Sequence, residues 1–264
     1  MGETLKRIMV ALPWIVVALA IIIAGGPWFA AALVVFGIIG LREFFTMSAR
    51  YRPLQPAAYL GLAGMIAAAY FGTAFNILLM MAVPFLLFFI FAAEREAREN
   101  ITASIAITAL GLFWIGIPLV HAVLLRELPD HGGALLVNVL IGTFGTDTGA
   151  YAVGRMFGRH PLSPRLSPNK TVEGLVGGLL IGVLAVWCAG LYQDWLSGTD
   201  ALILGAAVAA TAPIGDLFES MIKRDLEVKD TGSLFGPHGG LLDRLDAVFF
   251  TVVAGYYVSI ALVY

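Results

Sequence analysis

The sequence predicts an all-α, polytopic membrane protein with about nine transmembrane helices and a cytoplasmic N-terminus. Of its 264 residues, 59% are hydrophobic and 13% are charged, and its mean hydropathy is +0.89. Soluble domains are roughly half apolar and a quarter charged, so this composition excludes an ordinary soluble protein. The apolar residues also form runs long enough to cross a bilayer, and the basic residues fall at the ends of alternate runs.

A transmembrane helix needs about 20 apolar residues to cross the hydrocarbon core. Pro13 and Pro84 should each kink a helix, because proline removes a backbone donor and crowds the preceding turn. By this measure we expect nine spans, of which the third is the shortest, at Ile8–Ala24, Trp28–Leu41, Ala58–Tyr70, Phe75–Ala92, Ala103–Leu125, Ala134–Gly154, Gly174–Leu191, Ala201–Ile222 and Ala247–Val263.

We expect two regions along the chain. Residues 1–130 would form an N-terminal membrane region with spans one to five, and residues 131–264 a C-terminal region with spans six to nine and two polar loops. Neither loop is long enough to form a soluble domain, so any chemistry must lie at or within the membrane. Cys188 is the single cysteine, which excludes an intrachain disulfide.

The distribution of lysine and arginine predicts the orientation. When all 16 are assigned to alternate sides of the nine spans, Arg126 alone falls on one side and the others fall together. Positively charged loops are retained in the cytoplasm, so the N-terminus should lie inside and Tyr264 outside. The split holds only for an odd number of spans, and it therefore supports the count of nine.

The first polar loop, Gly145–Gly174, has the composition of a polyphosphate site. Asp147 lies inside an apolar run, where a carboxylate is costly and by default functional. Ser167, Lys170 and Thr171 follow among glycines and further basic residues, and phosphate oxygens accept charge-assisted hydrogen bonds from such groups. Free backbone amides at the start of the next helix would favour an anion as well. The alternative is a plain basic loop that is retained in the cytoplasm.

The second polar loop, Ser220–Asp246, and the helix before it carry two pairs of acids. Asp216 and Glu219 lie three residues apart on one helix face, and Asp243 and Asp246 repeat that spacing at the start of the last span. Four carboxylates at the ends of neighbouring spans would suit Mg²⁺, which prefers oxygen ligands and keeps waters and substrate phosphates in its shell. The sequence has no cluster of cysteine and histidine for zinc.

Glycines divide the second loop and permit tight turns and a close approach of the backbone to a ligand. Gly239 and Gly240 follow His238 directly. A lone histidine is often structural, but one between proline and two glycines, beside four acids, favours a role in the site.

The residues from Ser220 to Asp246 read S-x-x-K-R, four residues, K-D, and then H-G-G-x-x-D-R-x-D. This segment resembles the signature of the phosphatidate cytidylyltransferase (CDP-diacylglycerol synthase) family, with no departure from it. The upstream segments DTGAYAVGRMFGR and LSPNKTVEG are similar to the same family. The resemblance thus covers the C-terminal half by motif and the N-terminal half by hydropathy.

This resemblance implies a reaction in which CTP and phosphatidate give CDP-diacylglycerol and pyrophosphate, with Mg²⁺ as cofactor. The attacking lipid phosphate is already anionic, so the protein needs no strong base or nucleophile of its own. Its work would be to align two repelling anions and to neutralise the charge that grows on pyrophosphate. The resemblance also implies a homodimer in a bacterial plasma membrane, with no nucleic acid as partner. The active site should face the cytoplasm, because the basic residues and both polar loops fall on that side.

The resemblance also implies roles for individual residues. Asp216, Asp243 and Asp246 look like metal ligands, with Asp230 and Glu219 as weaker candidates, and the number of acids would allow a second cation. The whole set of candidate catalytic residues is Asp216, Lys223, Arg224, Lys229, Asp230, His238, Asp243, Arg244 and Asp246. Lys223, Arg224, Lys229 and Arg244 would hold phosphates, while Asp147, Ser167, Lys170, Thr171, Ser220, Gly239 and Gly240 would bind substrate.

Three other readings of the sequence stay open. In a transporter, Asp147 and Asp216 would relay ions or protons, although the polar residues gather at one face and no inverted repeat is visible. An enzyme that activates a different lipid phosphate, or a lipid kinase, is closer and harder to separate. A structural scaffold would leave the charged loop without a purpose.

Overall fold

The computed structural model describes residues 3–95, 100–232, 234 and 239–264, and for residues 3–12 and 14 it describes the backbone alone. This part of the chain forms nine α-helices, and each predicted span corresponds to one of them. The helices are α1 (Glu3–Ala24), α2 (Gly26–Met47), α3 (Gln55–Phe71), α4 (Ala74–Ala93), α5 (Ile101–Arg126), α6 (Gly132–Phe157), α7 (Val172–Gly190), α8 (Gly198–Asp225) and α9 (Leu242–Val263).

Among the described residues, six helices are long and apolar enough to cross a membrane: α2, α4, α5, α7, α8 and α9. Of the remaining three, α3 has only 17 residues and α6 is interrupted by polar side chains such as Asn138 and Asp147. The helical membrane architecture is therefore confirmed, while nine crossings and the orientation stay predictions.

The described chain departs from the expected all-α fold at a small hairpin between α6 and α7. Strand β1 (Pro161–Ser163) pairs antiparallel with strand β2 (Ser167–Thr171). Pro161, Pro164 and Pro168 lie in this stretch, and proline breaks a helix interior but is tolerated at sheet edges and turns. A one-turn 3₁₀ helix, Ala49–Tyr51, follows α2.

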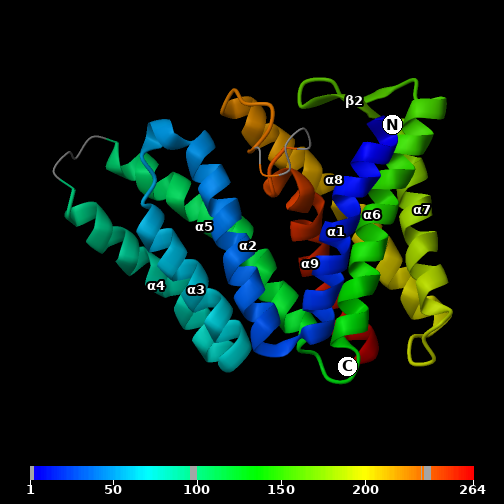
Figure 1. Ribbon diagram of the computed structural model, residues 1–264, viewed down its shortest axis with the longest axis horizontal. Helices are drawn as coiled ribbons and strands as arrows, with labels where there is room; N and C mark the ends of the chain where they lie inside the picture. The colour runs from blue at the N-terminus through cyan, green and yellow to red at the C-terminus, as the bar shows by residue number, and fades with distance from the viewer. Residues whose placement is uncertain (1–2, 96–99, 233, 235–238) are drawn as a thin grey trace.

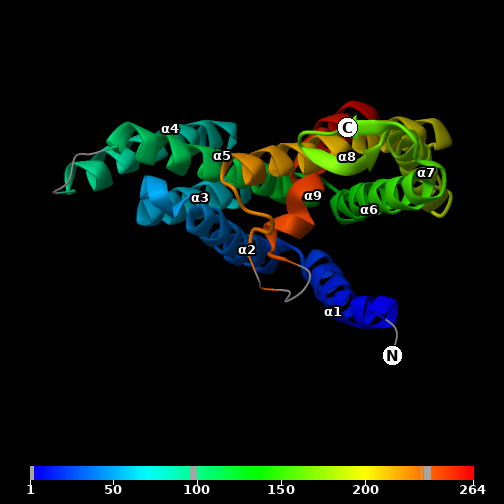
Figure 2. The same cartoon turned by 90° about the horizontal axis from the view of Figure 1, so that it is seen from above.

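The polar segments lie together at one end of the helical bundle. In Figure 1, the start of α1, the hairpin and the connection from α8 to α9 are all at the top, and the end of α9 is at the bottom. Seen from above in Figure 2, the molecule is elongated, with α3 and α4 at one end and α6 and α7 at the other. Helix α1 lies to one side, where it contacts α2 and α6. The two predicted polar loops are thus at the same end of the molecule.

Two kinds of packing hold the bundle together. Large apolar side chains fill the core between α2, α3 and α5, where Phe44, Phe45 and Leu62 are fully buried. Helices α6 and α7 instead approach through small residues, as is common between membrane helices. A Cβ atom added at Gly178 would lie 2.7 Å from the carbonyl oxygen of Thr146, so a larger residue would push the helices apart. This close contact fixes α6 beside the hairpin that leads into α7.

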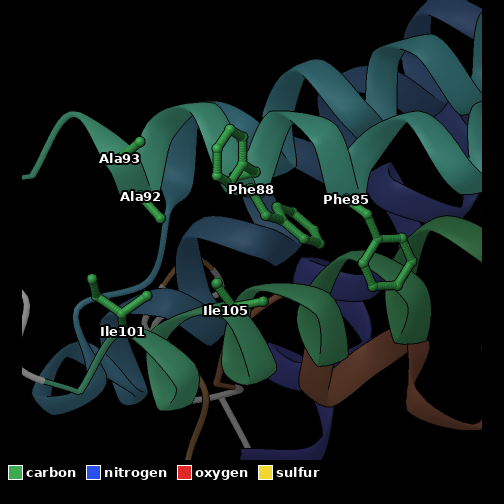
Figure 3. Close-up of a pocket in the computed structure, with 7 residues that line it drawn as sticks. Phe85, Phe88, Ala92, Ala93, Ile101 and Ile105 are labelled. Carbon is green, nitrogen blue, oxygen red and sulfur yellow. The ribbon is translucent and has the colours of Figure 1, made fainter.

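Two pockets in the described structure are almost entirely apolar. The first, of about 430 Å³, lies between α4 and α5, and Figure 3 shows the side chains that line it. Phe85 also lines the second pocket, of about 650 Å³, together with side chains of α5, α8 and α9. Among the residues that the structure describes, none that lines either pocket is charged, so both suit lipid chains better than a nucleotide.

Candidate active site

An ion pair between Lys170 and Asp216 joins the two polar regions. Lys170 lies on strand β2 of the hairpin, and Asp216 lies on α8 in the apolar run before the second loop. Both side chains are partly exposed, at 26% and 34%. Two segments far apart in the sequence therefore meet at one point that a ligand can reach.

Two further carboxylates lie close enough to interact electrostatically with Asp216. Asp147 comes from α6 and is exposed, and Asp246 comes from α9 and is half-buried. Helices α8 and α9 are in close contact here, because a Cβ atom at Gly215 would lie 3.0 Å from the Cα atom of Ala247. Three acids from three helices thus face one region beside Lys170, and their mutual repulsion makes that region attractive to a cation.

A second cluster centres on Lys223. Its Nζ atom lies 2.8 Å from Oε1 of Glu219 and 2.7 Å from Oδ1 of Asp243. The contact with Glu219 is an ion pair without the alignment of a hydrogen bond, whereas Asp243 accepts a hydrogen bond. The Glu219 side chain is completely buried and that of Lys223 is 19% exposed. Lys223 therefore pairs with Glu219 within α8 and ties α8 to α9 through Asp243.

The other oxygen of Asp243 closes the loop that precedes α9. It accepts hydrogen bonds from the Thr231 amide (2.9 Å), the Thr231 hydroxyl (2.8 Å) and the Gly240 amide (2.7 Å). Gly239 has a φ of +82°, a left-handed conformation that favours glycine, and an added Cβ atom there would collide with the Asp243 carboxylate. Asp243 is thus surrounded by donors from Lys223 and from its own loop.

Sequence comparison decides the family. The sequence model of the cytidylyltransferase family matches residues 5–262, which is nearly the whole chain. The chain belongs to the cytidylyltransferase family. The family that the signature between Ser220 and Asp246 predicted is therefore confirmed.

Individual proteins are similar to this chain over different lengths. A Synechocystis protein named phosphatidate cytidylyltransferase is 34% identical, over 97% of each chain. A Haemophilus influenzae protein of the same name is 42% identical over 50% of each chain. The Escherichia coli protein YnbB, named as uncharacterized, is 32% identical over 97% of this chain and 87% of its own.

The acids of this cytidylyltransferase have the right chemistry for Mg²⁺. Within the described ranges, no three side chains of His, Cys, Asp or Glu converge closely enough to enclose a metal ion. Magnesium does not need such a cage, because it is commonly held by one or two carboxylates together with water and substrate phosphates. Asp216 and Asp246 fit that pattern, since both are acids beside an accessible region.

The remaining predicted residues of the second loop lie around these clusters. The Nε atom of Arg224 donates to the carbonyl oxygen of Leu166 in the hairpin (3.3 Å), which makes a second link between the two polar regions. The Ser220 hydroxyl is 3.4 Å from Oδ1 of Asp216. His238 falls outside the described residues. Lys229, Asp230 and Arg244 are exposed, as is Arg224.

Thr171, one of the predicted substrate-binding residues of the hairpin, makes a hydrogen bond within the protein. The Thr171 hydroxyl accepts a hydrogen bond from the Gly174 amide (3.1 Å) and so caps the N-terminus of α7. Ser167, opposite Ser163 at the turn of the hairpin, is partly exposed. The roles of these residues in binding stay predictions.

Sequence reasoning missed two acids that organise the site. The Glu173 carboxylate accepts hydrogen bonds from the amides of Arg159 (3.0 Å) and His160 (3.2 Å) and so holds the entry to the hairpin. Glu43, on α2, contacts the backbone just before α9. Glu43 is an acid at the end of an apolar run, and this signal could have drawn attention to it.

Proposed function

We propose that this cytidylyltransferase transfers CMP from CTP to phosphatidate and releases pyrophosphate. The observation that carries the proposal is the Lys170–Asp216 pair, which brings both polar loops together beside Asp147 and Asp246. A phosphate and a metal ion could each replace one partner of this pair, since Lys170 attracts an anion and Asp216 a cation.

In the proposed reaction, a phosphate oxygen of phosphatidate attacks the α-phosphorus of CTP. The bond between that phosphorus and the oxygen that bridges to the β-phosphate breaks, and pyrophosphate leaves with the bonding electrons. The attacking oxygen is already ionised, so no proton has to be removed from it. The protein contributes position and charge, which are the main sources of catalysis in phosphoryl transfer.

We assign the binding of CTP phosphates to Lys170, with Arg224 beside it. Lys170 is on the hairpin, and Arg224 donates to the same hairpin from the end of α8. Ser167 and Thr171, on the same strand, would add hydroxyl groups. Lys229 and Arg244 are exposed, and we propose that they contact phosphates once substrate is bound.

We assign Mg²⁺ to Asp216 and Asp246, with Asp147 close enough to assist or to hold a second cation. When bound, the ion would neutralise charge on the triphosphate and on the leaving pyrophosphate. Asp243 and Glu219 are held by Lys223, and we propose that they act chiefly by fixing the geometry of α8 and α9.

The experiment that tests this function uses purified protein in detergent. We expect radiolabel from CTP to enter the lipid fraction when phosphatidate is present and Mg²⁺ is supplied, and not when the metal is chelated. Lysophosphatidate, a polyprenyl phosphate and ceramide phosphate serve as competing acceptors. Transfer to one of these in preference to phosphatidate would reassign the substrate. Failure to turn over CTP with any lipid, in protein that remains folded, would remove the enzyme assignment and leave the transporter reading.

We further propose that the enzyme lies in a bacterial plasma membrane with the hairpin in the cytoplasm, because the basic residues gather at that end. Cysteine labelling tests this in a Cys188→Ser background. A membrane-impermeant thiol reagent added to intact cells should label Asp194→Cys, between α7 and α8, and not Ser163→Cys in the hairpin. In permeabilised cells, both cysteine variants should be labelled. Labelling of Ser163→Cys from outside intact cells would show that the orientation is the reverse of the one proposed.

We also propose a homodimer, which follows from the family resemblance. Many large apolar side chains are exposed on the isolated chain, among them Phe71, Phe89 and Ile23. Lipid and a second subunit could each cover part of this surface. Light scattering in detergent should give twice the mass of the 28.1 kDa chain, and a single-chain mass would exclude the dimer.

A further inference from the structure

Glu43 of α2 binds the backbone at the start of α9, almost 200 residues further along the chain. Its Oε1 atom accepts a hydrogen bond from the Leu241 amide at 2.9 Å, and its Oε2 atom accepts one from the Leu242 amide at 3.0 Å. The Thr231 hydroxyl lies 3.3 Å from the same Oε2 atom. A single carboxylate of the N-terminal region therefore contacts both ends of the segment from Thr231 to Leu242.

These contacts cap a helix that cannot cap itself. The first amides of any α-helix lack partners within the helix, and a side chain of the preceding residue normally accepts from them. At α9 that residue is Leu241, whose side chain cannot accept a hydrogen bond, and the structure shows no local cap there. Glu43 takes this role from a distance, and its negative charge interacts favourably with the positive end of the helix dipole.

The fit around the Glu43 carboxylate is close. A Cβ atom at Gly232 would lie 2.8 Å from Oε1 of Glu43, and a Cβ atom at Gly240 would collide with the carboxylate. One turn before Glu43, Gly40 leaves room for Leu242, whose Cδ2 atom would be 3.1 Å from an added Cβ. The backbone of the loop is therefore packed directly against α2, which explains two of its glycines by contact within the protein.

A second contact, from the 3₁₀ helix that follows α2, reaches the other side of the loop. Arg50 donates through its Nη2 atom to the carbonyl oxygen of Asp225 (3.3 Å), the last residue of α8. The loop between α8 and α9 is thus held where it leaves one helix and where it enters the next. Because α8 carries Asp216 and α9 carries Asp246, the relative position of these two acids depends on how the loop is held.

We propose that Glu43 is a positioning residue for the transfer reaction, acting through the start of α9. The carboxylate holds the Leu241 and Leu242 amides and so fixes the first turn of α9. That turn carries Asp243 and leads directly to Asp246 in the next turn. The inference rests on the proposed function for its kinetic consequence only. The hydrogen bonds can be tested without any assay of activity.

The test compares Glu43→Gln with the wild-type protein in detergent, and Thr46→Ala serves as the matched control. Thr46 lies one turn further along α2, is exposed, and donates to the carbonyl oxygen of Arg42 within its own helix. Glutamine keeps the length of the side chain but loses the charge and one acceptor. We expect faster hydrogen exchange at the Leu241 and Leu242 amides in Glu43→Gln and unchanged exchange in Thr46→Ala.

The kinetic arm measures kcat and KM for CTP per folded molecule. A displaced α9 should lower kcat by roughly 10- to 100-fold with a smaller change in KM, and should raise the Mg²⁺ concentration for half-maximal rate. Glu43→Asp keeps the charge but is one methylene shorter, so it should recover part of kcat. It also serves as the test variant if Glu43→Gln does not fold.

Each outcome bears on the proposal. Faster exchange together with a lower kcat supports it. Unchanged exchange at the two amides would show that the hydrogen bonds do not hold α9, and faster exchange with a normal kcat per folded molecule would show that they do not matter for the reaction. Wild-type protein without cytidylyl transfer would instead remove the proposed function, and the exchange result would still decide whether Glu43 holds α9.

Discussion

Replacement of Lys223 by methionine is expected to destabilise the protein by about 3–5 kcal/mol, the usual cost of removing one partner of a buried ion pair. Glu219 has no exposed surface, and the ammonium of Lys223 lies 2.8 Å from it. Without Lys223, the Glu219 carboxylate would be left in an apolar interior, and Asp243 would lose its hydrogen bond at 2.7 Å. Thermal unfolding in detergent measures the loss, with Lys229→Met as an exposed lysine from the same loop for comparison.

A double variant separates this explanation from a simple loss of packing. In Lys223→Met/Glu219→Gln the buried charge is gone along with its partner, so part of the lost stability should return. If the double variant were as unstable as the sum of the two single variants, the ion pair would not be the cause. If Lys223→Met were as stable to heat as the wild-type protein but bound CTP poorly, Lys223 would instead be the phosphate ligand that the sequence predicted.

Replacement of Asp246 by asparagine is expected to lower turnover by at least about 100-fold while the protein stays folded. Asparagine keeps the size and one carbonyl oxygen but loses the charge that a divalent cation needs. Stability should hold, because Lys223 already has Glu219 and Asp243 as partners. Asp246 also repels Asp216, so loss of its charge should not destabilise this region.

The measurement follows CTP turnover as Mg²⁺ is varied, next to an unfolding curve of the same preparation. Asp194→Asn makes the same substitution at an exposed position between α7 and α8 and should behave as wild type. A deficit that deepens as Mg²⁺ is lowered supports a role in holding metal. An unfolded Asp246→Asn would point to an ion pair, and a folded variant of normal activity would exclude Asp246 from the site.

The sequence was sufficient to predict the helices because a long apolar run is an unambiguous signal. Each of the nine predicted runs lies within or almost within one helix, and even the weakest run, Ala58–Tyr70, corresponds to α3. The hairpin was missed for a physical reason. Its strands have three and five residues, and the pairing of Pro161 with Thr171 depends on a contact across a turn that no local pattern encodes.

At the site, the sequence indicated which charged residues gather there, but not which side chains pair with one another. Lys170, Asp216 and Asp246 lie around one region, as their grouping in two polar loops led us to expect. The four-residue spacing of Glu219 and Lys223 places both on one face of α8. It did not predict that Lys223 would be held between Glu219 and Asp243, because that depends on how α8 packs against α9.

Glu43 shows where such reasoning ends. It lies in the N-terminal region, about 200 positions from the amides that it binds, and a single sequence carries no signal that links the two. Its neighbours on α2 are Arg42 and mostly apolar residues, and they offer no motif. The contact exists only because α2 and α9 come together in the folded bundle.

The most direct test of cytidylyl transfer follows two labels in CTP separately, with phosphatidate and Mg²⁺ present. Label at the α-phosphate should appear in the lipid product, and label at the γ-phosphate should appear only in pyrophosphate. The opposite distribution, with the γ-label in the lipid, would identify a lipid kinase and contradict the proposed reaction. Lipid that carries neither label, from folded protein with Mg²⁺ present, would contradict it as well.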